Sequence, residues 1–225
     1  MSPAGLRTML EPEAIRILQE YGVPYPEHGL AHSAEEAVGI ANRLGYPVVL
    51  KVVSGDVVHK SDLGGVVLGI ENGQQIVRAY EGIVSSIAER LPGAKVEGLL
   101  VCRQAPPGLE VIVGAVHDAM FGPALMFGLG GVFAEVLRDV SFRVLPVERT
   151  DAAGMIREIQ GYPLLAGTRG RAGYDIEALV ELLLTISRMV LERPEIEELD
   201  LNPVRLYERG LLALDARIMR RERLP

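Results

Sequence analysis

Residues 50–65 read Leu50-Lys51-Val52-Val53-Ser54-Gly55-Asp56-Val57-Val58-His59-Lys60-Ser61-Asp62-Leu63-Gly64-Gly65. An apolar strand is interrupted only by Lys51, and the loop after it carries His59 beside Lys60. The chain has three lysines against twenty arginines, and two of the three lie in this stretch. Lysine is a compact point charge that suits a phosphate group, whereas arginine is a planar fork. The stretch therefore predicts a loop that holds polyphosphate, with His59 as a nucleophile for a transferred phosphoryl group.

Composition limits the classes of protein to which the chain can belong. It has 225 residues, a formal net charge of −7 and 48% hydrophobic residues. These values are typical of a soluble α/β protein and argue against nucleic-acid binding, which needs a basic face. The single cysteine, Cys102, excludes an internal disulfide and fits a reducing compartment. No apolar run is long enough to span a membrane, and the first residues lack the apolar core of a signal peptide. We expect a cytoplasmic protein with neither nucleic-acid nor membrane partners.

The predicted elements alternate helices with strands that pair locally, which favours two α+β lobes over a doubly wound Rossmann sheet. Ser33 is expected to cap one helix, with Glu36 as its partner in a capping box. The rigid turn at 105–108 is the best lobe boundary and divides the chain into residues 1–104 and 105–225. Helices are expected at 11–21, 33–44, 74–91, 150–159 and 175–191, and strands at 46–53, 66–70, 96–103, 110–116, 124–127, 199–207 and 211–218.

Glycines in the opening stretch support the phosphate hypothesis. Gly55, Gly64 and Gly65 permit close backbone approach and would aim amide donors at one anion. The stretch matches neither the Walker A pattern nor the dinucleotide-binding glycine pattern. Two alternative interpretations stay open. Lys51 could extend from a strand edge into solvent, and His59 could be an ordinary surface histidine.

The C-terminal hairpin predicts a metal site. A two- or four-residue turn centred between Glu208 and Arg209 would place Asn202 directly opposite Asp215, with their Cβ atoms about 5 Å apart. Both residues interrupt strands that are otherwise mostly apolar. A carboxylate and an amide oxygen that converge in this way suit Mg²⁺. The alternative is that Asn202 caps a turn before Pro203 while Asp215 pairs with an arginine.

A second glycine-rich segment, Gly128-Leu129-Gly130-Gly131, precedes Glu135 and Asp139. It is either a second anion-binding loop with an acidic pair or a tight turn into a strand. Glu110 begins a strand after Pro-Pro-Gly-Leu, a position from which a carboxylate could accept hydrogen bonds from ribose hydroxyls.

Together the motifs resemble a known family, the ATP-grasp β subunits of ADP-forming acyl-CoA synthetases, of the acetate–CoA ligase (ADP-forming) group. The resemblance covers nearly the whole chain in order. It is carried by Leu50-Lys51-Val52, His59-Lys60-Ser61-Asp62-Leu63-Gly64-Gly65-Val66, Phe121-Gly122-Pro123, Phe127-Gly128-Leu129-Gly130-Gly131 and Asp200-Leu201-Asn202-Pro203-Val204.

The resemblance implies an ATP-grasp fold of two α+β lobes that enclose the nucleotide. It implies a ligase that interconverts acyl-CoA, ADP and phosphate with the free acid, ATP and CoA through phosphohistidine. His59 would be the catalytic relay histidine, and Asn202 and Asp215 would be the Mg²⁺ ligands. The nucleotide-binding residues that it implies are Lys51, Val58, Lys60, Val101, Cys102, Arg103 and Glu110. The phosphate-loop positions are Gly64, Gly65, Gly130, Gly131 and Glu135.

Related succinyl-CoA synthetase β chains carry a further CoA-ligase-type domain, whereas this chain ends at Pro225. We therefore expect a separate α subunit with the CoA and acyl-phosphate sites, in an α2β2 assembly. Cys102 stands where related chains often have a polar residue, so adenine would be recognised by backbone groups. Alternative functions are a nucleotide-binding regulatory module and an ATP-grasp ligase without phosphohistidine.

Overall fold

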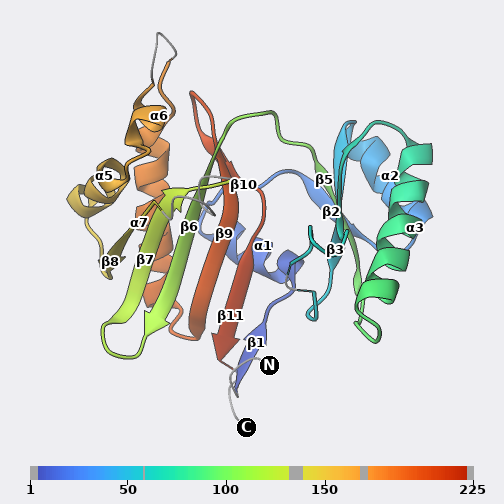
Figure 1. Cartoon of the computed structure of the whole chain (residues 1–225), viewed down its shortest axis with the longest axis horizontal. Coiled ribbons are helices and arrows are strands. Elements are labelled where there is room, and N and C mark those ends of the chain that lie inside the picture. Colours follow the sequence, from blue (N-terminus) through green and yellow to red (C-terminus); the bar gives the residue numbers. More distant parts are fainter. Residues whose placement is uncertain (1–4, 58, 132–138, 168–171, 222–225) are drawn as a thin grey trace. The chain divides into compact units, whose positions relative to one another are not determined.

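The computed structural model describes residues 5–57, 59–131, 139–167 and 172–221 (Figure 1). The chain divides into two compact units, one formed by Pro26–Pro106 and the other by Met1–Tyr25 together with Pro107–Pro225. The boundary expected near residue 105 is close to the observed one. The assignment of the first 25 residues to the N-terminal lobe is corrected, because these residues complete the sheet of the C-terminal unit.

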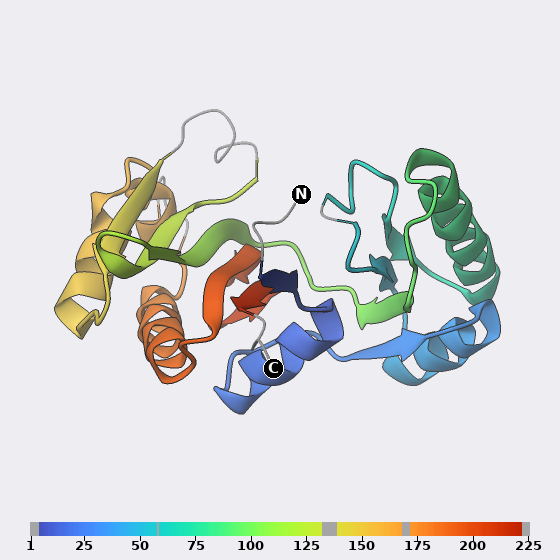
Figure 2. The same ribbon diagram turned by 90° about the horizontal axis from the view of Figure 1, so that it is seen from below.

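The unit Pro26–Pro106 is a four-stranded antiparallel sheet with two helices. Its strands, in spatial order, are β2 (His28–Ala31), β5 (Gly98–Arg103), β3 (Val48–Val53) and β4 (Val66–Ile70). The helices α2 (Ala34–Leu44) and α3 (Gly73–Arg90) lie on one face of the sheet (Figure 2). Their apolar stripes bury Ile40, Ile76, Ile83 and Ile87 against alternate strand residues such as Leu50 and Val101. This alternation leaves the odd-numbered residues of β3 on the opposite face.

Side-chain caps define where these two helices begin. The Ser33 hydroxyl accepts a hydrogen bond from the Glu36 amide at 3.2 Å, as expected. The Glu36 carboxylate accepts from the His32 amide at 2.8 Å rather than from Ser33, so the capping box closes one residue earlier than predicted. Asn72 caps α3 in the same manner by accepting from the Gln75 amide at 3.0 Å.

The other unit contains a seven-stranded antiparallel sheet. Six strands follow the order β1 (Leu6–Thr8), β11 (Arg217–Arg221), β9 (Ile196–Leu206), β6 (Leu109–Asp118), β7 (Gly122–Leu129) and β8 (Val140–Val144), and β10 (Leu211–Ala213) also pairs with β9. The N-terminal segment joins this sheet because Leu6 pairs with Arg221 and the Met9 amide donates to the Ile218 carbonyl at 2.8 Å.

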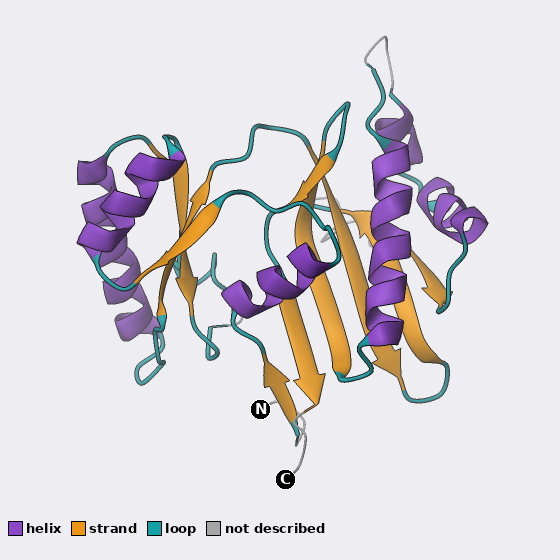
Figure 3. Ribbon diagram, turned by 180° about the vertical axis from the view of Figure 1, so that it is seen from behind, coloured by secondary structure: helices purple, strands orange, loops and turns teal. Residues whose placement is uncertain are grey.

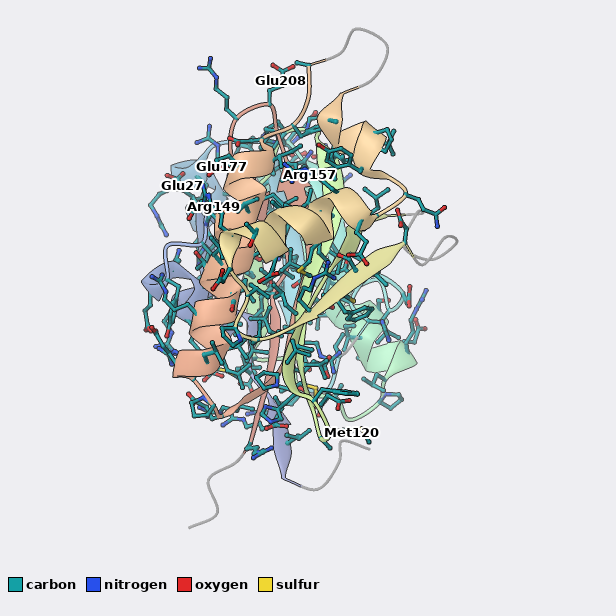
Figure 4. All side chains as sticks on the ribbon, turned by 90° about the vertical axis from the view of Figure 1, so that its left-hand side faces the viewer. Glu27, Met120, Arg149, Arg157, Glu177 and Glu208 are labelled. Atoms are coloured by element: carbon teal, nitrogen blue, oxygen red, sulfur yellow. The ribbon has the colours of Figure 1, made fainter. Side chains whose placement is uncertain are left out.

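Helices cover one face of the seven-stranded sheet. They are α1 (Glu11–Glu20), α5 (Arg149–Glu158), α6 (Tyr162–Ala166) and α7 (Ile176–Glu192). Figure 3 shows α1 and α7 on the same face of the strands. Both helices bury leucine and isoleucine residues in one core with β6, β7 and β9. Arg149 at the start of α5 forms ion pairs with Glu177 and, at 2.5 Å, with Glu181 of α7 (Figure 4).

Among the described residues, no helix combines the length and the apolar character that crossing a membrane requires.

Candidate functional site

Lys51 lies in the interior of the four-stranded sheet. Its partners across the ladder are Val66 on β4 and Leu100 on β5, and only 6% of the residue is exposed. Because β3 has a neighbour on each side, Lys51 does not extend into solvent from a strand edge. Its positive charge, on the strand that leads into the His59 loop, makes this lysine a candidate for binding an anion.

The loop between β3 and β4 carries His59, which is exposed, and Lys60, which is half-buried. Val58 lies outside the described residues. The loop closes on itself, because the Gly65 amide donates to the Lys60 carbonyl at 2.7 Å and the Gly64 amide donates to the Ser61 carbonyl at 3.1 Å. The expectation that the amides of Gly64 and Gly65 point to an anion is therefore corrected. Both amides donate instead to backbone carbonyl groups of the same loop.

The glycine pair is needed for close packing instead. A Cβ atom at Gly65 would lie 2.6 Å from Val52 Cγ1 and 2.9 Å from the Lys60 carbonyl oxygen. Gly64 has a φ of +70°, a conformation that side-chain-bearing residues rarely adopt. These two positions fix the turn that returns the chain from His59 to β4.

Residues Val101 to Arg103 form the end of β5, a central strand. Cys102 pairs with His28 on β2 and with Val49 on β3, so the strand that carries it has a neighbour on each side. The Arg103 amide donates to the Glu27 carbonyl at 2.8 Å. The chain leaves the sheet after Arg103, and the boundary between the two units follows Pro106. Val101 and Cys102 are buried, and Arg103 is exposed.

In the other unit, Glu110 lies on β6 directly opposite Arg205 on β9. Their side chains form an ion pair at 2.5 Å and are 32% and 21% exposed. The Gly130 amide donates to the Glu110 carbonyl at 2.8 Å, so this amide too is unavailable to an anion and the phosphate-loop expectation is corrected for Gly130. A Cβ atom at Gly131, which has a φ of +62°, would lie 3.7 Å from Glu110 Oε2.

Of the acidic pair expected after this glycine segment, the structure describes only Asp139. Glu135 lies outside the described residues. Asp139 is buried, and its two carboxylate oxygens accept hydrogen bonds from the amides of Gln160 and Gly161, each at 2.7 Å. Asp139 therefore holds the segment that joins α5 to α6.

The C-terminal hairpin has the predicted register. Its turn spans Tyr207 to Gly210, and Ala213 pairs with Val204. The Leu214 amide continues this register by donating to the Pro203 carbonyl at 2.9 Å. Farther along, Arg217 pairs with Asp200 in the same register, so the backbone aligns Asp215 with Asn202. Asn202 is exposed and Asp215 is half-buried.

Asp200 is a further candidate beside Asp215 that the sequence analysis did not single out. Burial, the largest cause, together with the negative charges of Asp215 and Glu198 raises its pKa to about 6, against an opposite effect of Arg217. The period of two along β9 could have identified Asp200, since it lies two positions before Asn202.

The residues at this hairpin fit a hard divalent cation. Asn202 and Asp215 supply an amide and a carboxylate oxygen, which are donors that Mg²⁺ prefers. The pKa of Asp200 is raised first by burial and then by the negative charges of Asp215 and Glu198, and a cation would offset the second of these effects. In the described part of the chain, no three His, Cys, Asp or Glu side chains form a cluster that could hold a metal.

Comparison with known proteins reveals close similarity over nearly the whole length. Residues 2–219 match the family model described as ATP-grasp domain. The chain is 47% identical over 213 residues to the "Acetate--CoA ligase [ADP-forming] I subunit beta" of Pyrococcus furiosus, which covers 95% of this chain and 92% of that protein. It is also 47% identical to "Acetate--CoA ligase [ADP-forming] I" of Archaeoglobus fulgidus, but spans only 30% of that longer protein.

Solved structures of the dinucleotide-forming acetyl-coenzyme A synthetase 1 of Ca. Korarchaeum cryptofilum are similar too. One, in complex with coenzyme A, Ca-AMPCP and HgCl+, matches with a TM-score of 0.92 and 47% identity, and covers 96% of this chain and 94% of that one. Another, with coenzyme A and Mg-AMPPCP and a phosphohistidine segment pointing towards the nucleotide-binding site, has a TM-score of 0.82 and 44% identity over 96% and 93% of the two chains.

Proposed function

Because this chain belongs to the ATP-grasp family and to its ADP-forming acetate–CoA ligase β subunits, we propose that it transfers a phosphoryl group between phosphohistidine and ADP. Together with an α subunit, it would interconvert acyl-CoA, ADP and phosphate with the free acid, ATP and CoA. The resemblance and the ATP-grasp fold class that the sequence predicts are confirmed. The observation that carries the proposal is that exposed His59 and buried Lys51 belong to one strand and its loop.

His59 is proposed as the relay. In the direction of ATP formation, a ring nitrogen of neutral His59 attacks the phosphorus of a phosphohistidine on the partner. The new N–P bond forms while the partner's N–P bond breaks, and that electron pair returns to the partner's imidazole. An oxygen of the ADP β-phosphate then attacks the phosphorus on His59, and the N–P electron pair returns to the His59 imidazole.

Positive charge from the unit Pro26–Pro106 would support this transfer. The ammonium groups of Lys51 and Lys60 lie on the strand and the loop that also carry His59, and each suits a phosphate oxygen. Fixed charge in a partly buried setting stabilises a transferring phosphoryl group more strongly than the same charge in water. Glu110 is proposed to accept from the ribose hydroxyls.

A divalent cation would be held by Asn202 and Asp215. When bound, Mg²⁺ would offset the charge of the nucleotide phosphates. The Mg-AMPPCP in the Korarchaeum structure supports the use of a magnesium–nucleotide complex. Asn202 and Asp215 would hold the cation, and Asp200 would add negative charge beside them.

The partner is proposed to be a separate α subunit. A relative called subunit beta and a longer single-chain relative both contain the region matched by this chain, which supports an α portion that is joined in some proteins and separate in others. An α2β2 stoichiometry and a cytoplasmic location complete the proposal, and the single cysteine is compatible with a reducing compartment.

The test is acyl-CoA-dependent ATP formation by the chain with the α subunit of an ADP-forming acetate–CoA ligase. The His59→Ala variant should lose ATP formation while its nucleotide affinity stays nearly unchanged. His117→Ala is the matched control, because His117 is an exposed histidine at the end of β6. Normal ATP formation by His59→Ala would remove His59 from the mechanism.

A further inference from the structure

The helix α3 contacts the His59 loop through two side chains. The Ser86 hydroxyl donates a hydrogen bond to the Leu63 carbonyl at 2.8 Å, and Arg90 Nη1 donates to the Asp62 carbonyl at 2.9 Å. Ser86 and Arg90 are four residues apart and so lie on the same face of the helix. Their acceptors are consecutive carbonyl groups. Two points on a rigid helix therefore hold two neighbouring peptide units of the loop.

These contacts lead directly to His59. The Leu63 amide donates to the His59 carbonyl at 3.4 Å. Leu63 therefore has two contacts: its carbonyl accepts from Ser86, and its amide donates to His59. The Val52 amide donates to the Gly65 carbonyl at 2.8 Å and fixes the other end of the turn to β3. Ser86, Leu63 and His59 thus form a short chain of hydrogen bonds from the helix to the backbone of the relay residue.

Gly64 provides the space that the Ser86 contact needs. A Cβ atom at Gly64 would lie 2.8 Å from Ser86 Oγ, closer than real Cβ atoms approach an oxygen. Gly64 also has a φ of +70°, a backbone conformation in which a side chain would be strained. Gly64, which the sequence suggested for phosphate contact, therefore lies against Ser86 of α3.

We propose that Ser86 and Arg90 are positioning residues for the phosphoryl transfer. They hold the turn 60–65 so that the His59 imidazole meets the phosphoryl group from a fixed backbone. This inference rests on the proposed relay role of His59. A loop of exposed residues without such tethers would sample many positions, and a small displacement of a reacting group lowers the rate steeply.

The first experiment compares Ser86→Ala with Ser85→Ala in the complex with the α subunit. Ser85 is the exposed neighbour on the same helix, and alanine favours helix at both positions. We expect Ser86→Ala to lower kcat about tenfold, since a misplacement of about 1 Å can cost a hundredfold. The KM for ADP should stay within about twofold because the nucleotide contacts remain. Ser86→Thr should restore most of kcat, because it restores the hydroxyl group.

A second experiment measures the turn itself by amide hydrogen exchange. In Ser86→Ala and Arg90→Ala, the amides of Leu63 to Gly65 should exchange faster, while the amides in the middle of β3 should not change. Arg78→Ala, an exposed arginine on the same helix, is the control for Arg90.

The proposal is overturned if Ser86→Ala keeps the kcat and exchange rates of Ser85→Ala, or if Ser86→Thr fails to restore kcat. If His59→Ala remains fully active, the proposed function fails instead. A loss of activity in His59→Ala with normal kcat in Ser86→Ala would leave the proposed function intact and reject the positioning role alone.

Discussion

Glu110 and Arg205 lie directly opposite each other on β6 and β9 and form an ion pair at 2.5 Å. The pair lies beside the glycine segment, because the Glu110 carbonyl accepts from the Gly130 amide and a Cβ atom at Gly131 would lie 3.7 Å from Glu110 Oε2. Arg205 therefore orients the carboxylate that we propose for ribose. The sequence alone identified Glu110 but not its arginine partner.

Glu110→Gln tests the ribose role. The side-chain amide of the variant has no charge and cannot form an ion pair with Arg205. We expect the KM for ADP to rise several-fold while kcat changes little, because the lost contact would bind substrate and transition state equally. The control is Glu158→Gln, which removes the carboxylate from the Arg143–Glu158 ion pair at 2.6 Å in the same unit. Equal KM values in the two variants would contradict a nucleotide contact at Glu110.

Gly65→Ala tests the packing of the turn. The new methyl group would lie 2.6 Å from Val52 Cγ1 and 2.9 Å from the Lys60 carbonyl oxygen, where the backbone cannot easily move. We expect the free energy of unfolding to fall by about 1–3 kcal/mol, as for other overpacked sites. Gly82→Ala on α3, which has open space, should raise the free energy by roughly 0.5–1 kcal/mol. Denaturant unfolding measures both, and an unchanged Gly65→Ala midpoint would refute the close packing.

Asp175 gives a pH-dependent contribution to stability. Its carboxylate accepts hydrogen bonds from the Gly210 amide at 2.7 Å and the Ala178 amide at 3.0 Å, and these bonds lower its pKa. Because the folded-state pKa is depressed, the stabilisation is present above the unfolded pKa of about 4 and is lost as the pH falls through the folded value.

We therefore expect Asp175→Ala to lower the free energy of unfolding at pH 7 by about 1 kcal/mol, the usual value of an N-cap. The difference from the wild type should begin to shrink below pH about 4, where the unfolded carboxylate takes up a proton, and should fall further as the pH approaches the lowered folded pKa. Asn72→Ala is the control, since Asn72 caps α3 without a titrating group. A deficit in Asp175→Ala that is the same at pH 3 and pH 7 would contradict the charged cap.

Asp215→Asn tests the proposed cation site. Loss of the carboxylate should raise the Mg²⁺ concentration needed for half-maximal ATP formation by at least about tenfold, because a hard cation prefers charged oxygen ligands. Glu208→Gln removes a carboxylate from the turn of the same hairpin, where Glu208 is exposed (Figure 4), and should leave the Mg²⁺ requirement unchanged. The assignment fails if both variants require the same Mg²⁺ concentration as the wild type.

Local patterns predicted much of this fold. The strand around Lys51, the Ser33 cap and the register of the Asn202–Asp215 hairpin follow from alternation, capping and turn chemistry within short segments. Pairings between distant segments could not be read in this way. Nothing near Leu6 indicates that it pairs with Arg221, so the first 25 residues were assigned to the wrong lobe.

In the candidate site, too, the sequence identified residue types but not their contacts. Residue type identified Lys51, His59 and Glu110 as candidates, but a sequence does not state where an amide hydrogen points. The amides of Gly64 and Gly65 donate to carbonyl groups within the loop. Cys102 lies on a strand that is paired on both sides. Asp200 was missed because its raised pKa arises from burial and from Asp215, which is distant in sequence.

The most direct measurement of the central claim is phosphohistidine mapping. The chain is incubated with γ-labelled ATP and Mg²⁺, with and without the α subunit, and acid-labile, base-stable label is located by peptide mapping. We predict label on His59 in the wild type and in His117→Ala, and none in His59→Ala. If the α subunit becomes labelled while His59 never carries label, phosphoryl transfer bypasses His59 and the relay is contradicted.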